Sequence, residues 1–118
     1  MQLVTAIIQP DKLDDVREAL VAAGISRITT SRVTGHGQHQ DQQHSSERLY
    51  RGQKVIPNLI PKIRMDIACN DEFVDIAIAA ILKSAKHDGG RIGDGKIFVT
   101  ELKRCIRIRT EESGSQAV

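Results

Sequence analysis

A glycine-rich segment in the last third of the chain carries residues suited to anion binding. In the stretch GRIGDGKIFV, glycines alternate with charged residues just before a strand pattern: Gly93, Asp94, Gly95 and Lys96. Because glycine has no Cβ, backbone N–H groups there can turn toward an anion and form a concavity that holds phosphate. We predict a phosphate-binding loop in which Lys96 and Arg91 neutralise the phosphate charge. The alternative is a flexible helix-to-strand turn, since isolated glycine patterns are weak signals.

Two arginines near the C-terminus suit the same kind of ligand. Arg107 and Arg109 lie two residues apart in CIRIRT. If this segment is extended, both guanidinium groups point to one side while Ile106 and Ile108 face the core. Paired guanidinium groups bind polyphosphates well, so we expect these arginines in the same site. A solvated basic edge is the alternative.

The histidines offer two other kinds of chemistry. His36, His39 and His44 share one polar segment, and imidazole groups on one loop can gather around Zn, Cu or Ni. Their spacing matches no established zinc pattern, so a solvated loop that faces a partner is the competing interpretation. His87 and Asp94 could serve as base and acid in nucleotide hydrolysis. No nucleophile and no oriented dyad accompany them, which makes an enzyme the weaker alternative.

Composition limits the partners and the location that we expect. The chain has 118 residues, enough for one domain, and its 17 Lys and Arg exceed its 15 Asp and Glu only slightly. A net charge of +2 does not indicate nucleic acid or an anionic membrane as a partner. Cys69 and Cys105 lack CxxC spacing, and no N-terminal apolar stretch is long enough for a signal peptide or a membrane span. We expect a cytoplasmic protein with reduced thiols, no nucleic-acid partner and no membrane insertion.

Hydrophobic periodicity divides the chain into four strands and two helices. The strands are expected at residues 3–9, 25–33, 62–69 and 96–102. Asp11 is expected to cap the first helix, which ends at Gly24. Asn70 or Asp71 caps the second helix. The buried stripe of that helix is predicted to contain Phe73, Ile76, Ala77, Ala80 and Ile81.

The order of these elements predicts a single α+β domain, residues 1–118, with a ferredoxin-like βαββαβ sandwich. Both faces of the first strand are apolar, with Ile7 on one side and Ile8 on the other. Helices can cover only one face, so a neighbouring copy of the chain is expected to cover the other. The polar segment between the second and third strands is longer than a usual connection, and we expect it to be functional or disordered.

Several stretches together resemble the PII signal-transduction family over nearly the whole chain: AIIQPDKLDDVREAL, GHG, LYRG, LIPKIRMDI, GRIGDGKIFV and RIRTEE. GDGKIFV followed by RIRT is the most specific combination. The resemblance implies a homotrimer that binds ATP or ADP in the clefts between subunits and regulates other proteins rather than catalysing a reaction. It also implies a T-loop (about 37–57) that docks onto a target such as an ammonium transporter or a metabolic enzyme. A B-loop (about 87–96) would cradle phosphates, followed by a C-terminal segment (103–118).

The resemblance also assigns roles to individual residues. The nucleotide-binding residues that it implies are Thr29, Gly35, Gly37, Gln38, Gly93, Asp94, Gly95, Lys96, Arg107 and Arg109. The two arginines would reach the phosphates from the neighbouring subunit. Lys62 corresponds to the lysine that holds the carboxylate of 2-oxoglutarate, and His39 to a glutamine that helps to coordinate Mg²⁺ beside it. For Lys62, however, we favour the role of an exposed lysine at the start of a strand.

This chain departs from the family pattern at several positions. Gln38 replaces a basic residue that contacts phosphate, and His39 is a poorer ligand for a hard cation than an oxygen donor, unless Gln38 or Gln40 takes its place. We therefore expect ATP or ADP binding, with or without Mg²⁺, and no classical 2-oxoglutarate sensing. Val55 stands where the family carries a modifiable tyrosine, so no covalent modification is expected there. A divergent sensor of a metal or a small anion, or a slow ATPase, is the alternative function.

Overall fold

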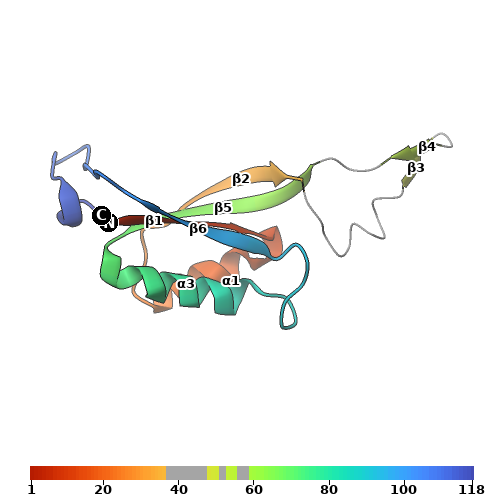
Figure 1. The fold of residues 1–118 in the computed structure, drawn as a ribbon, viewed down its shortest axis with the longest axis horizontal. Helices are drawn as coiled ribbons and strands as arrows, with labels where there is room; N and C mark the ends of the chain where they lie inside the picture. Colours follow the sequence, from red (N-terminus) through yellow and green to blue (C-terminus); the bar gives the residue numbers. More distant parts are fainter. Residues whose placement is uncertain (37–47, 51–52, 56–58) are drawn as a thin grey trace.

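The computed structural model describes residues 1–36, 48–50, 53–55 and 59–118. Four antiparallel strands form one sheet in the order β2-β5-β1-β6, and helices α1 and α3 lie on one face of it (Figure 1). The bounds are β1 Gln2–Ile8, α1 Leu13–Ala22, β2 Thr29–Gly35, β5 Ile60–Cys69, α3 Asp71–Ala85 and β6 Gly95–Glu101. Two short 3₁₀ helices are η1 at Pro10–Lys12 and η2 at Gly114–Gln116.

This topology confirms the predicted ferredoxin-like α+β fold. A separate hairpin, β3 (Arg48–Tyr50) paired with β4 (Gln53–Val55), lies within the long segment between β2 and β5. Each of its strands has three residues, too few to show an alternating pattern, so it was not expected. Neither helix in the described ranges is long and apolar enough to cross a lipid bilayer.

The second strand begins later than predicted because the residues before it end helix α1. Gly24 has a φ of +87°, and the Ile25 amide donates a hydrogen bond to the Leu20 carbonyl at 2.9 Å. This 6→1 bond is typical of a helix C-terminus closed by a left-handed glycine. Ile25 itself is buried. Strand β2 therefore starts at Thr29 instead of residue 25.

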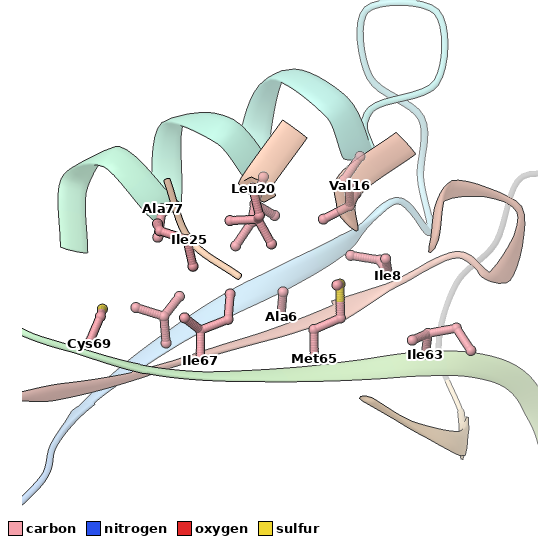
Figure 2. Close-up of a cluster of buried hydrophobic side chains, with 13 residues drawn as sticks. Ala6, Ile8, Val16, Leu20, Ile25, Ile63, Met65, Ile67, Cys69 and Ala77 are labelled. Carbon is pink, nitrogen blue, oxygen red and sulfur yellow. The ribbon is translucent and has the colours of Figure 1, made fainter. Parts of the chain in front are cut away.

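The core lies between the sheet and the two helices (Figure 2). Alternate residues of the central strands point toward the helices because side chains of a strand alternate between its two faces. These strand residues are Val4, Ala6, Ile8, Ile63, Met65 and Ile67. The helices contribute mainly Val16, Leu20, Ala77 and Ile81. Burial of these apolar side chains is the main driving force for this sandwich.

Part of the predicted buried stripe of α3 is wrong. Phe73 is 39% exposed and Ile76 is 44% exposed. The residues of that stripe that do contact the core are Ala77, Ala80 and Ile81, joined by Ala85. Because α3 is apolar around much of its circumference, its own periodicity does not identify the face that packs on the sheet.

The face of the sheet opposite the helices stays partly apolar in a single protomer. Strand register places Phe98 beside Thr5, and Lys96 beside Ile7, on this open face. Phe98 is 44% exposed, and Ile7 is only half-buried. No helix covers this face in the part of the chain that the structure describes (Figure 1). An apolar surface of this kind gains stability when another chain covers it.

Candidate functional site

The predicted phosphate loop joins the end of α3 to the start of β6. It lies at the end of the sheet where β1 ends, β2 ends and β5 begins (Figure 1). Gly95 pairs with Ile8, and Ile8 in turn pairs with Ile63. Gly35, the last residue of β2, pairs with Ile60 at this same end. The loop and the root of the long β2–β5 connection are therefore close neighbours.

Gly95 anchors the loop against the sheet through a close backbone contact. Its φ is +113°, a conformation that L side chains rarely adopt. A Cβ on Gly95 would lie 1.7 Å from the carbonyl oxygen of Ile7. Only glycine fits at this position without movement of the backbone. Gly95 therefore fixes the backbone conformation at the point where the loop joins β6.

The carbonyl of Gly93 accepts hydrogen bonds from two side chains. Gln9 Nε2 donates a hydrogen bond to it at 2.6 Å, and Lys62 Nζ donates another at 2.7 Å. Lys62 is half-buried, so the expectation of a freely exposed lysine is wrong. Burial lowers the pKa of Lys62, and the nearby Asp94 carboxylate partly offsets this. Lys62 thus orients the loop whatever further ligand it contacts.

Asp94 points back into the loop. Its Oδ2 accepts hydrogen bonds from the amides of Arg91 at 2.7 Å and His87 at 3.1 Å. Its Oδ1 lies 2.6 Å from His87 Nδ1. Burial alone would raise the pKa of Asp94, but the bonds from the Arg91 amide and from His87 outweigh it and lower the pKa. The carboxylate therefore organises the loop backbone.

His87 lies between two carboxylates. In addition to Asp94, its Nε2 lies 2.8 Å from Asp11 Oδ2. The bond to Asp11, followed by the bond to Asp94, raises the pKa of His87. The prediction that His87 and Asp94 lack an oriented arrangement is wrong. A protonated imidazole that donates from both nitrogens has no lone pair to accept a proton, so this geometry does not favour a general base.

Backbone amides near the end of the loop are available to a ligand. No hydrogen bond from the Ile92 or the Gly93 N–H group to another described residue is formed. Lys96 lies nearby at the start of β6, with its Nζ 5.5 Å from the centroid of the Phe98 ring. Successive free amides beside a cation can hold an anion. The geometry is therefore suited to one end of a phosphate chain.

Other residues of the predicted site do not reach this loop within one protomer. The seven residues of β6 span about 20 Å, which separates Gly95 from the segment that contains Arg107 and Arg109. Thr29 begins β2, six positions before Gly35, and β5 and β1 lie between β2 and β6. Gly35 is near the loop, whereas Gly37 and Gln38 lie outside the described residues.

The predicted extended conformation around the two arginines is wrong. The Glu111 amide donates to the Arg107 carbonyl at 2.8 Å, so the chain turns there. Ile108 is 97% exposed and faces away from the core. Arg107 Nε donates to the Ala117 carbonyl at 3.4 Å. Spacing alone could not reveal this turn, because Glu111 supplies it with an unusual positive φ of 58°.

The metal prediction receives no test from the geometry. Among the described residues, no group of three or more His, Cys, Asp or Glu side chains is arranged to hold a metal ion. His36 lies at the edge of the described region, and His39 and His44 lie outside it.

Comparisons with a family model and with individual proteins point to the same family. The family model for nitrogen regulatory protein P-II matches residues 1–112. A nitrogen regulatory protein P-II from Rhizobium etli is 46% identical over 118 residues, covering all of both chains. Nitrogen regulatory protein GlnK from Escherichia coli K12 is 47% identical over the same full length, and a P-II protein from Rhodobacter capsulatus is 45% identical.

Proposed function

The chain belongs to the nitrogen regulatory protein P-II family and is a nitrogen-signalling regulator. On this premise we propose that it binds ATP or ADP and controls a target protein through its T-loop, residues 37–57. The observation that carries the proposal is the construction of the loop at 87–96. Gly95 fixes its path, two side chains hold the Gly93 carbonyl, and free amides lie beside Lys96.

A homotrimer completes the proposed nucleotide site. Arg107 and Arg109 lie at the opposite end of β6 from Gly95, so they cannot serve the loop of their own protomer. A second copy, packed against the open face that carries Ile7 and Phe98, can bring its own arginines to that loop. Closed rings of identical subunits repeat such a contact at every interface. Guanidinium groups and loop amides would then bind the phosphates together.

Control of the target follows from where the T-loop is rooted. Gly35 ends β2 at the same end of the sheet as Gly95. A nucleotide at the loop can therefore contact the first residues of the T-loop. A ligand shifts a conformational equilibrium by the difference in its affinity for the two states. ATP and ADP differ in their phosphate contacts, so they would favour different T-loop states. The target would be an ammonium transporter or a metabolic enzyme reached from the cytoplasm.

We propose that binding does not need 2-oxoglutarate. Lys62 already donates to the Gly93 carbonyl, and His39 is a weak Mg²⁺ ligand. Loop amides and Lys96 suit a phosphate. The oxygens that could hold Mg²⁺ are engaged elsewhere, because the Gly93 carbonyl accepts from Gln9 and Lys62 and the Asp94 carboxylate contacts His87. If Mg²⁺ accompanies ATP, it would neutralise phosphate charge.

Isothermal titration calorimetry with ATP, ADP and AMP tests the proposal. We expect ATP and ADP to bind with one site per chain and AMP to bind more weakly, because AMP lacks the phosphates that the loop amides contact. Titrations with and without Mg²⁺ and 2-oxoglutarate separate the cofactor requirements, and sedimentation measures the oligomeric state. Failure of every adenine nucleotide to bind, or a monomer in solution, would reject the proposal. Tight binding of a transition metal without nucleotide would favour the alternative sensor.

A further inference from the structure

His87 joins two parts of the chain that are distant in sequence. Its ring contacts Asp11 in η1, 76 residues away, and Asp94 in the phosphate loop. Both contacts are short, at 2.8 and 2.6 Å. The His87 side chain is only 17% exposed. The imidazole therefore holds the loop to the start of the first helical segment.

This arrangement is complete in only one protonation state of the ring. The imidazolium donates a hydrogen bond from each nitrogen, one to each carboxylate. A neutral imidazole carries one N–H, so its other nitrogen would place a lone pair against a carboxylate. Loss of the proton therefore breaks one bond and leaves two carboxylates facing each other across a neutral ring. The contact is specific for the charged ring.

We propose that protonated His87 is a positioning residue for the phosphate loop, which holds Asp94 so that the loop binds nucleotide, and that deprotonation weakens this binding. The proposal rests on the proposed nucleotide-binding function and adds a form of regulation to it. Asp94 is the link: its Oδ1 meets the ring, while its Oδ2 accepts the amides of Arg91 and His87. Release of the ring removes one side of this support.

The charges around His87 favour the protonated form. The carboxylates of Asp11 and Asp94 face the ring from η1 and from the loop. The positive charge of Lys12 interacts with Asp11, and that of Lys62 interacts with Asp94. These two cations affect the ring only through the carboxylates. In the same loop Asp88 pairs with Arg91. The two carboxylates in direct contact outweigh the more distant cations, and they raise the pKa of His87.

The direction of the pH effect follows from these charges. The pKa of His87 is raised from an ordinary value of 6.5. The pair of hydrogen bonds from the His87 ring to Asp11 and Asp94, here called the clamp, is therefore intact at and below that pH. It is lost as pH rises through the raised value. Asp11 and Asp94, whose pKa values are lowered, stay ionised throughout. Nucleotide affinity should therefore fall on the alkaline side.

The test compares ATP affinity of wild type, His87→Gln and Asp11→Asn by calorimetry from pH 6 to pH 9, with the His87 titration followed by NMR in parallel. The ratio of wild-type to His87→Gln affinity cancels the titration of the nucleotide itself. We expect this ratio to fall about fivefold or more across the range, with the midpoint at the pKa that NMR gives for His87. In Asp11→Asn the midpoint of the NMR titration of His87 should lie at lower pH than in wild type, because the substitution removes one carboxylate from the ring. Matched His44→Gln, a histidine outside the proposed nucleotide site, should keep the wild-type profile.

Three results separate this proposal from the function on which it rests. A ratio that stays constant with pH, while wild type binds ATP, overturns the role of His87 and leaves the nucleotide site in place. An unshifted midpoint in Asp11→Asn also overturns it, even if His87→Gln folds poorly. No ATP binding by wild type at any pH overturns the proposed function, and the role of His87 falls with it.

Discussion

Gly95 and Ile7 approach each other so closely that a Cβ on Gly95 would lie 1.7 Å from the Ile7 carbonyl oxygen. This contact joins the phosphate loop to β1, the strand at the centre of the core. The position of the loop is therefore set by the fold of the sheet. Under the proposed function, a nucleotide at the loop would lie at the same end of the sheet as Gly35, the last residue of β2.

Gly95→Ala tests how far this contact fixes the loop. We expect the free energy of unfolding to fall by about 1–3 kcal/mol beyond the cost of backbone strain, because the added methyl group clashes with backbone, and ATP affinity to fall as well. Gly90→Ala is the matched control, since Gly90 has a similar φ of +119° but open space around its Cβ position. Backbone strain in the control should cost about 1 kcal/mol. Equal effects of both substitutions, measured by urea denaturation, would contradict the close contact.

Leu20→Ala tests the core. Leu20 belongs to α1 and is fully buried in the core, so its truncation should cost about 2–5 kcal/mol by removing contacts and leaving a cavity. Val21→Ala in the same helix is the comparison, because Val21 is more than half exposed. Its cost should stay near or below about 0.5 kcal/mol. Urea midpoints at one fixed protein concentration give both values, and a larger effect at Val21 would place the core elsewhere.

The order of elements could be predicted from the sequence because it depends on local signals. Alternation in residues 62–69 reproduced β5 within two residues, and Asn70 stands at the N-cap of α3 as expected. The face of α3 could not be found in this way, since Phe73 and Ile76 are as apolar as the residues that are buried. Packing of α3 against β1 and α1 determines which of its faces is buried.

The position of the glycine-rich loop could be predicted in the same manner. Its glycines and Lys96 lie within one short stretch of sequence, directly before β6. Lys62 contacts Gly93, which is 31 residues away in the sequence. Asp11 contacts His87, which is 76 residues away. For His87 the sequence indicates only a possible base. Its contact with Asp11 was not foreseen, because no local pattern connects the two.

Stability should depend on pH through His87. The pKa of His87 is raised in the folded state, so its contribution is present below the ordinary value of about 6.5 and disappears as pH rises through the folded-state value. Urea midpoints of wild type should therefore decrease on the alkaline side of pH 6.5. His87→Gln should show a smaller decrease over the same range. Parallel curves for the two proteins would show that the clamp does not stabilise the fold.

Deletion of residues 39–44 should separate nucleotide binding from target binding. This segment lies outside the described residues and contributes none of the core residues identified in the described part of the chain. We expect the oligomer and ATP affinity to change less than about twofold. Binding to a detergent-solubilised ammonium transporter from the same organism should be lost, if that is the target. Dissociation of the oligomer, seen by sedimentation, would contradict this separation.

Subunit complementation tests the central claim, that each nucleotide site combines the loop of one protomer with the arginines of the next. Lys96→Ala and Arg107→Ala each alter every site in a homotrimer, and each should weaken ATP binding. Mixed trimers made by coexpression of the two variants contain interfaces at which an intact Lys96 meets an intact Arg107. Random assembly gives about one such site in four.

The decisive measurement is calorimetric titration of these mixed trimers with ATP. The account predicts that wild-type affinity returns at about a quarter of the sites. A mixture of Lys96→Ala with the double variant Lys96→Ala/Arg107→Ala should recover none, which makes it the matched control. If the mixed trimers of the two single variants also recover no site of wild-type affinity, the two residues do not act across a subunit boundary, and the account is contradicted.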